Sequence, residues 1–245
     1  MDGDESATGT IWDPYVLLTE GTVESLQQIP WGSNYTFCAA LRREDAGALA
    51  IYKPMRGERP LWDFPSGTLY LRERAAYLTS QALGWSFVPL TVVRDGPHGV
   101  GSMQLYVEAE PLPSFQELGA LADLDLARIA AFDLITNNAD RKGGHILRDG
   151  QGKLWGIDHG LCFNVEPKVR TVLQHFCGGT VPTEVREELR AFEADPQRVA
   201  SLAHLLDGVI AAEEFAVFLG RVRTLASSGV YPRLDHYRSV PWPNW

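Results

Sequence analysis

The stretch FDLITNNADRKGGHILRDGQGKLWGIDHGLCF, residues 132–163, decides how the rest of the chain is interpreted. Its apolar start predicts the end of a helix, and the polar residues that follow predict a turn. Two short strand-like runs come next, at residues 145–148 and 153–157, joined by the turn residues DGQG. A helix, a loop and a hairpin would therefore bring Asp140, on the entering loop, close to Asp158, on the leaving turn.

Two carboxylates placed in this way suit phosphoryl transfer. One of them would orient the acceptor hydroxyl, and the other would hold the magnesium ion that bridges the nucleotide phosphates. Each fragment alone is weak, since Asp-Arg in a loop and Asp-His-Gly in a turn are both common. Their joint spacing, together with the features upstream, favours the functional interpretation over a purely structural one.

Length, composition and charge bound the class of protein. The chain has 245 residues, 45% of them hydrophobic, which is enough for one large domain or two small lobes. The net charge of −9 disfavours a general nucleic-acid surface or docking on an anionic membrane. We therefore expect neither a nucleic-acid partner nor stable membrane association.

The N-terminus and the cysteines predict a cytoplasmic protein. Residues 1–10 are acidic and polar, and no run of about 18 apolar residues occurs anywhere in the chain. Cys38, Cys162 and Cys177 are an odd, scattered set without the spacing of metal ligands or of a disulfide framework. A reduced setting is the interpretation that fits this pattern.

Residues 21–108 predict a lobe built on an antiparallel sheet, after an N-terminal extension of residues 1–20. A short helix or turn at residues 11–18 would pack on this lobe. The lobe itself is expected to have five strands and one helix. Strand-like runs occupy residues 21–28, 35–42, 48–53, 88–94 and 101–108, and the helical pattern occupies residues 69–83.

Four residues of this lobe could contact a nucleotide. Lys53 is a cation in the apolar run AIYKP and could reach phosphates, although such a side chain also extends to solvent. Glu73 could pair with Lys53, although most helical glutamates are solvated. The turn with Ser33 and Asn34 could lay backbone N–H groups on phosphate oxygens, or be an ordinary hairpin turn.

The segment AEPLP, residues 109–113, cannot continue a central strand and predicts a hinge between two lobes. The backbone of Tyr106, Val107 and Glu108 could bind an adenine ring there, because clefts between lobes are favoured ligand sites. Residues 114–245 predict a mainly helical second lobe with an irregular tail. Its helices are expected at residues 114–121, 125–135, 184–192, 197–206 and 213–225, with Asp123 or Asp125, Thr183 and Asp195 at their starts.

Six ordered blocks between residues 20 and 165 carry a family resemblance. They are AIYKP (50–54), RAAYL (74–78), VPLTVV (88–93), GSMQLYVE (101–108), NNADR (137–141) and IDHGLCF (157–163). The sequence resembles the phosphatidylinositol 3-/4-kinase-like family, and most a small bacterial branch, of actinobacterial type, related to type II phosphatidylinositol 4-kinases. This resemblance implies an α+β, two-lobed protein-kinase-like fold with an antiparallel N-lobe sheet and a mainly helical C-lobe.

The resemblance also implies roles for single residues. Lys53 would contact the phosphates of ATP and Glu73 would hold Lys53, while Asp140 would serve the acceptor hydroxyl and Asp158 would bind Mg²⁺ or Mn²⁺. The departure is His145, which stands where the family usually has a metal-binding Asn. Imidazole suits zinc or manganese better than magnesium. His145 could therefore bind metal, orient Asp158 or a phosphate, or simply begin a strand.

We expect an ATP-dependent phosphotransferase that acts on a protein hydroxyl or a small soluble polyol. Lipid is a less favoured acceptor because the lipid-anchoring cysteine cluster of the type II enzymes and a basic membrane face are both absent from the sequence. The alternatives are a nucleotide-binding regulatory module without strong catalysis, motivated by His145, and a nucleotidyl transferase. Retention of Lys53, Glu73, Asp140 and Asp158 favours the active enzyme.

Overall fold

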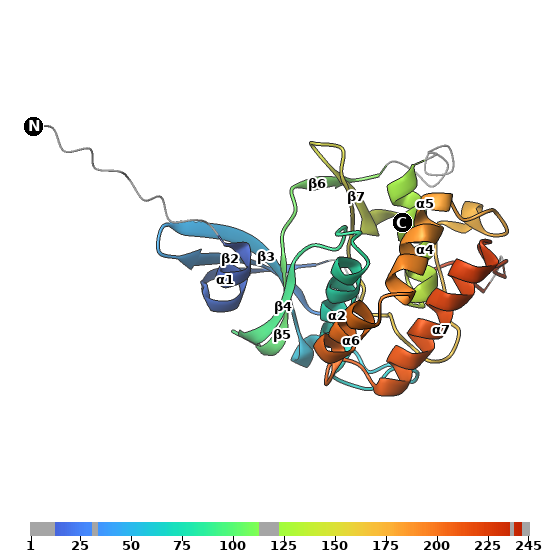
Figure 1. Cartoon of the computed structure of the whole chain (residues 1–245). Helices are drawn as coiled ribbons and strands as arrows, with labels where there is room; N and C mark the ends of the chain where they lie inside the picture. The colour runs from blue at the N-terminus through green and yellow to red at the C-terminus, as the bar shows by residue number, and fades with distance from the viewer. Residues whose placement is uncertain (1–12, 31–33, 113–122, 236–237, 242–245) are drawn as a thin grey trace, which may run out of the picture.

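An antiparallel sheet forms the first lobe, with five strands in the order β1-β2-β3-β5-β4 (Figure 1). The computed structural model describes residues 13–30, 34–112, 123–235 and 238–241. Short turns join β2 to β3 and β4 to β5, so these neighbours pair as hairpins. The strands are β1 Thr22–Ile29, β2 Thr36–Arg43, β3 Ala46–Pro54, β4 Thr91–Gly96 and β5 Gly99–Leu105.

The two faces of this sheet have different roles. Tyr52 pairs in register with Met103, and both are buried in the apolar cluster that contains α1, Pro14–Glu20. This confirms the short N-terminal helix that the sequence predicts. Side chains alternate along a strand, so Lys53 and Gln104 lie on the opposite face. That second face is the one turned toward the candidate site.

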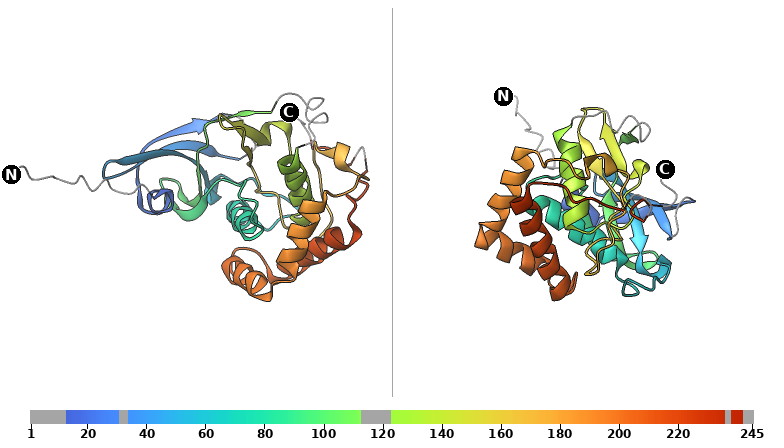
Figure 2. Two further views of the ribbon diagram at one scale, coloured as in Figure 1. Left: turned by 45° about the horizontal axis from the view of Figure 1, so that its top comes forward. Right: turned by 90° about the vertical axis from the view of Figure 1, so that its right-hand side faces the viewer.

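Helix α2, Leu69–Ala82, lies between the sheet and the helical lobe (Figures 1 and 2). It contacts β4 and β5 on one side and α6, Pro196–Leu206, on the other. Arg72 is buried and fastens the helix to the second lobe: Nη1 donates to the Cys162 carbonyl at 2.6 Å, and Nη2 pairs with Glu214 at 2.7 Å. The helix is therefore part of both lobes.

The second lobe is built around a helix with buried residues on nearly all sides, α4, Leu124–Ile135. Asp123 caps this helix by accepting hydrogen bonds from the N–H groups of residues 125 and 126. Phe132 packs edge-on against Phe87 and against the ring of His159, which carries the core up to the candidate site. The other helices of this lobe are α5 Thr183–Glu193, α6 Pro196–Leu206 and α7 Ala212–Ser228.

A small sheet of three strands, β6-β7-β8, joins the lobes. The strands are β6 Ala109–Pro111, β7 Ile146–Asp149 and β8 Leu154–Gly156. The hairpin of β7 and β8 confirms the prediction from residues 145–157. Strand β6 is an edge strand that the sequence analysis did not predict, and it agrees with the expectation that residues 109–113 do not continue a central strand. Pro111 is tolerated because β6 lies at the edge of the sheet, where a missing N–H breaks no ladder.

Other boundaries differ from the sequence prediction for local reasons. Strand β4 begins at Thr91 and not at residue 88, because Pro89 has no N–H to donate to a ladder. Thr183 is the first residue of α5 and not its cap; Pro182 occupies the cap position without a side-chain hydrogen bond. His145 belongs to a 3-10 turn, η2 Gly143–His145, and β7 begins one residue later. The helix predicted at residues 114–121 lies outside the described residues.

The described part of the irregular tail packs on the second lobe. The buried Tyr231 donates its hydroxyl hydrogen to the Ala127 carbonyl at 2.9 Å, and the Ser239 carbonyl accepts from the Thr171 N–H at 3.0 Å. Within the described residues, no helix has the length and apolar content needed to cross a bilayer.

Candidate active site

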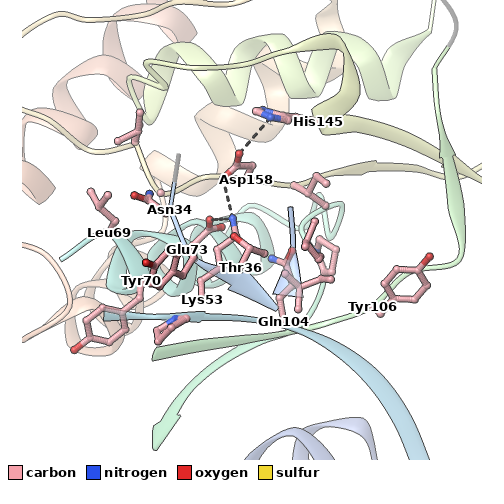
Figure 3. Close-up of a pocket in the computed structure, with 18 of the residues that line it drawn as sticks. Asn34, Thr36, Lys53, Leu69, Tyr70, Glu73, Gln104, Tyr106, His145 and Asp158 are labelled. Atoms are coloured by element: carbon pink, nitrogen blue, oxygen red, sulfur yellow. Dashed lines mark hydrogen bonds and ion pairs between the residues drawn. The ribbon is translucent and has the colours of Figure 1, made fainter. Parts of the chain in front are cut away.

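A cavity of about 280 Å³ opens between the β7–β8 hairpin and the face of the five-stranded sheet that carries Lys53 and Gln104 (Figure 3). It gathers residues that are far apart in sequence, from the end of β1 to the turn after β8. The predicted site residues that line it are Asn34, Lys53, Glu73, Tyr106, Val107, Asp140, His145 and Asp158.

Lys53 is the cation at the centre of this cavity. It stands next to the end of β3, paired in register with Ser102, and its ammonium donates to Glu73 and, at 2.8 Å, to Asp158 Oδ1 (Figure 3). Burial alone would lower the pKa of Lys53, but the charges of Asp158 and Glu73 raise it above its ordinary value. Lys53 therefore stays protonated at neutral pH and is able to bind an anion.

Glu73 connects three parts of the fold. It lies on α2 and is only 2% exposed, so its carboxylate needs partners. Oε1 accepts from Lys53 on β3, and Oε2 accepts from the backbone N–H of His159 at 3.0 Å. One carboxylate thus sets the positions of the sheet, the helix and the turn that carries Asp158.

Asp158 sits in a backbone conformation that L-residues rarely adopt, with φ of 59°. Oδ1 accepts from Lys53, and His145 Nε2 lies 3.2 Å from Oδ2. Burial would raise the pKa of Asp158, but the Lys53 charge holds it well below its usual range. The carboxylate is therefore ionised, and both of its oxygens are held by neighbours.

His145 orients Asp158 from the turn η2. Burial lowers the pKa of His145 to about 4, with the positive charges of Arg141, Lys53 and Lys142 adding to the effect and the charge of Asp158 opposing it. The neutral ring accepts from the Lys142 N–H at Nδ1, 3.4 Å away, and donates from Nε2 to Asp158. Both ring nitrogens are thus engaged.

Asp140 faces the same cavity from the loop after α4. Its own N–H donates to Asn138 Oδ1 at 3.0 Å, and its Oδ2 pairs with Lys142 at 3.1 Å. Burial raises the pKa of Asp140 above its ordinary value, although the hydrogen bond and charge of Lys142 oppose the rise. A carboxylate with a raised pKa is suited to accept a proton.

A buried ion pair holds the two aspartate loops together. Asp133 and Arg141 are both 0% exposed, and Arg141 Nη2 lies 3.0 Å from Asp133 Oδ1. Arg141 also donates to the Ile157 carbonyl at 2.8 Å and contacts His159 Nε2 at 2.6 Å. Burial raises the pKa of Asp133, and the Arg141 charge opposes the rise. Arg141 follows Asp140 in the chain and contacts Ile157 and His159, the two neighbours of Asp158. The Asp133–Arg141 ion pair therefore sets the separation of Asp140 and Asp158.

Two predicted binding residues are placed differently from the expectation, and a third lies outside the part of the chain that the structure describes. Ser33 lies outside the described residues. Glu108 lines a neighbouring shallow depression with Arg148, and not the cavity that contains Lys53. The N–H of Tyr106 donates to the Leu49 carbonyl at 3.0 Å, so this part of the hinge backbone is taken by the sheet.

Sequence reasoning missed Lys142, Gln104 and the Asp133–Arg141 pair. Lys142 forms an ion pair with Asp140, and Gln104 lines the cavity from β5. A usable signal existed for Asp133, which is a charged residue inside the apolar helical run that ends at Ile135. Lys142 and Gln104 carried no such signal, because polar residues in loops and strands are common.

The donor chemistry fits a metal ion bound together with a nucleotide. Asp140 and Asp158 line the cavity and offer carboxylate oxygens, which Mg²⁺ and Mn²⁺ prefer. Across the described ranges, no group of three or more His, Cys, Asp or Glu side chains could hold a metal ion. A nucleotide-bound Mg²⁺ is usually held by one or two carboxylates and the phosphates themselves. Asp158, with oxygens already oriented, is the residue that would hold it.

Comparison with known sequences gives one relative that covers nearly the whole chain. No protein-family model matches. Protein Rv2133c of Mycobacterium tuberculosis is 37% identical over 266 aligned residues, which cover 94% of this chain and 95% of that protein. Phosphatidylinositol 4-kinase gamma 4 of Oryza sativa subsp. japonica is 37% identical over 113 residues, covering 38% of this chain and 20% of the rice protein.

Two solved structures share the fold. A Golgi casein kinase superposes with a TM-score of 0.58 and 15% identity, over 87% of this chain and 74% of that chain. The Helicobacter pylori proinflammatory kinase CtkA superposes with a TM-score of 0.50 and 12% identity, over 87% of this chain and 94% of that one. These likenesses confirm the predicted two-lobed, kinase-like α+β fold.

We expect Arg141→Met to lower the free energy of unfolding by about 3–5 kcal/mol, because Asp133 would become an uncompensated buried charge. Urea denaturation measures this loss. The control is Arg42→Met, which breaks an exposed pair with Glu24 and should change stability by at most about 1 kcal/mol. Adding Asp133→Leu to Arg141→Met should recover part of the loss. Equal effects of the Arg141 and Arg42 substitutions would contradict the structural role of the buried pair.

Stability should fall as pH is lowered from about 6.5 toward 4. In this window the unfolded chain protonates His145 near its ordinary pKa, whereas the folded protein keeps it neutral because its pKa is lowered to about 4. The unfolded state then binds more protons, so folding is penalised as pH falls. His145→Asn should reduce the slope of unfolding free energy against pH, measured by denaturation from about pH 4.5 to 7.5. His159 and His175, whose pKa values burial also lowers, would contribute to the remaining slope. An unchanged slope would contradict this account of His145.

Proposed function

Because this chain belongs to the same family as the mycobacterial protein Rv2133c and has a kinase-like fold, we propose that it is an ATP-dependent phosphotransferase of the phosphatidylinositol 3-/4-kinase-like superfamily. The observation that carries the proposal is the position of Lys53. Its ammonium lies between Glu73 and Asp158, and Asp140 lines the same cavity. A cation for phosphates, a carboxylate for metal and a second carboxylate for the acceptor are the parts that phosphoryl transfer needs.

The charges of the site divide the work between its residues. Lys53 would bind phosphate oxygens by charge-assisted hydrogen bonds, and Glu73 would keep it extended toward them. Asp158 would hold Mg²⁺ or Mn²⁺, which neutralises charge on the phosphates when bound. Lys142, beside Asp140, would add positive charge near the transferred group.

In the reaction, the acceptor oxygen forms a bond to the terminal phosphorus while the bond from phosphorus to the bridging oxygen of ADP breaks. Asp140 would orient the acceptor hydroxyl and take its proton as the new bond forms. The raised pKa of Asp140 favours this role, since the carboxylate then holds the proton more readily than an exposed aspartate. Asp158, with its lowered pKa, stays ionised throughout.

The acceptor we propose is a protein hydroxyl or a small soluble polyol, used in the cytoplasm. The net charge of −9 disfavours attraction to an anionic bilayer, which makes a lipid acceptor the weaker choice. For the same electrostatic reason we propose no nucleic-acid partner.

One observation favours a second candidate, a nucleotide-binding regulatory module with weak catalysis. Lys53 and His145 already contact both carboxylate oxygens of Asp158. His145 stands where the phosphatidylinositol 3-/4-kinase-like family usually has a metal-binding Asn. If these contacts persist, metal binding at Asp158 is weakened and turnover is slow. Binding of ATP without transfer would be the result of this arrangement.

Labelled ATP separates these functions. Purified protein is incubated with Mg²⁺ or Mn²⁺ and with γ-labelled or α-labelled ATP, alone, with cell extract and with polyols. Label transferred from γ-labelled ATP only supports a phosphotransferase, and label from α-labelled ATP only supports a nucleotidyl transferase. Binding without transfer supports the regulatory module.

Lys53→Met should lower binding or turnover by tenfold or more through loss of phosphate contacts, with the exposed Lys153→Met as the matched control. Full activity of the Lys53 variant would sink the proposal.

The two aspartates should respond differently to removal of charge. Asp158→Asn should abolish the metal-dependent part of ATP binding, because an amide offers one weak oxygen ligand in place of a carboxylate. Asp140→Asn should leave ATP binding within about threefold and lower kcat by about a hundredfold or more, since its group acts mainly in the transition state. Calorimetric titration and initial rates measure the two effects.

Asp45→Asn, in the exposed turn between β2 and β3, is the matched control and should change neither quantity. An equal loss of ATP binding in the Asp140 and Asp158 variants would show that the division of roles is wrong.

A further inference from the structure

The cavity has a charged end and an apolar end. Lys53, Asp140 and Asp158 lie at the charged end. Ile51 precedes Lys53 by two residues on β3, and Leu147 follows His145 by two residues, so both lie toward the hinge. Apolar side chains contributed by both lobes suit a flat aromatic base. Other apolar residues that line the cavity are Ile29, Pro89 and Ile157.

Gln104 is a buried polar side chain at this apolar end. It lies on β5, pairs in register with Ile51 and is 6% exposed (Figure 3). Two residues further along the chain, Tyr106 begins the hinge side of the cavity. Gln104 therefore stands between the Lys53 cluster and the hinge, beside the place that a base would occupy.

A chain of hydrogen bonds fixes which way the Gln104 amide points. The Thr91 hydroxyl donates its single hydrogen to the Pro89 carbonyl at 2.9 Å. Thr91 Oγ1 can then only accept from Gln104, and Gln104 Nε2 lies 2.8 Å away. If the amide were reversed, Gln104 Oε1 would face Thr91 Oγ1, and neither oxygen would have a hydrogen to donate to the other. The nitrogen of Gln104 thus faces β4, and its Oε1 is the atom left for the cavity.

Oε1 of Gln104 accepts from no donor among the residues that the structure describes, and it is not sealed away from the cavity. It is an acceptor held in one direction by a fixed side chain. The backbone N–H groups at the next two positions are already used within the first lobe. The Leu105 N–H donates to the Leu90 carbonyl at 2.8 Å, and the Tyr106 N–H donates to the Leu49 carbonyl at 3.0 Å.

We propose that Gln104 selects adenine among purine bases, with Oε1 accepting a hydrogen from the exocyclic amino group and Thr91 holding Gln104 in that orientation. The inference rests on the proposed function, since it requires a purine nucleotide in this cavity. Guanine and hypoxanthine carry a carbonyl oxygen where adenine carries the amino group. That oxygen would face Oε1 and leave two acceptors without a donor, which is the kind of mismatch that polar sites reject strongly.

The test compares binding of ATP with binding of ITP, whose base carries the carbonyl in place of the amino group. Calorimetric titration of the full chain with each nucleotide and Mg²⁺ gives the ratio of the two dissociation constants. We expect the wild type to bind ATP at least tenfold more tightly. Gln104→Leu keeps the volume of the side chain and removes the amide, so the ratio should fall to within about twofold of one. Gln151→Leu, in the exposed turn between β7 and β8, is the matched control and should keep the wild-type ratio.

Thr91 supplies a second pair of variants that do not touch Gln104. Thr91→Val removes the hydroxyl and frees the amide to rotate, so the ATP-to-ITP ratio should fall severalfold while overall affinity for ATP changes less. Thr91→Ser retains the hydroxyl and should restore the ratio. A residue with only a packing role would affect both nucleotides equally. These variants also decide the matter if Gln104→Leu fails to fold.

The outcomes separate this inference from the proposed function. Tight ATP binding with a ratio near one in the wild type, or with an unchanged ratio in Gln104→Leu, overturns the role of Gln104 and leaves the nucleotide site standing. Binding of neither nucleotide to the wild type overturns both. A selective wild type with loss of selectivity in Gln104→Leu and Thr91→Val supports the assignment.

Discussion

The buried pair of Asp133 and Arg141 is the interaction on which the geometry of the site depends. Two full charges without solvent are tolerated only when hydrogen bonds satisfy the remaining atoms, and here Asn138, Thr171 and the Ile157 carbonyl do so. Arg141 follows Asp140 directly in the chain and touches both neighbours of Asp158. The ion pair therefore connects a helix, a loop and a hairpin turn that would otherwise vary in separation.

Glu73 extends this framework to the first lobe. It receives Lys53 from the sheet and the His159 N–H from the turn, and His159 in turn contacts Arg141. Helix α2 also binds the second lobe through Arg72, so its position is set from both sides. The Lys53–Glu73 ion pair therefore depends on the packing of α2 against both lobes. The cavity and its charges come from the same set of contacts.

Environment also gives the two site aspartates opposite properties. Lys53 holds the pKa of Asp158 below its usual range, whereas burial raises that of Asp140. Two identical side chains whose pKa values are pushed apart suit two different roles, one as a permanent anion and one as a proton acceptor. His145 contributes by donating to Asp158 as a neutral ring.

Local patterns in the sequence determined the elements: the strands around Lys53, the helix that carries Glu73, and the loop and turn with Asp140 and Asp158 are all readable from periodicity and turn residues. The kinase-like fold was implied by the resemblance of six ordered sequence blocks to a known family. The partners of Asp133, Arg141 and Gln104 were decided only by the tertiary structure. Each depends on partners far along the chain or across a sheet, and a single polar residue has the same local signature whether it is paired or solvated. Pairing is a property of three-dimensional proximity, which local sequence patterns do not encode.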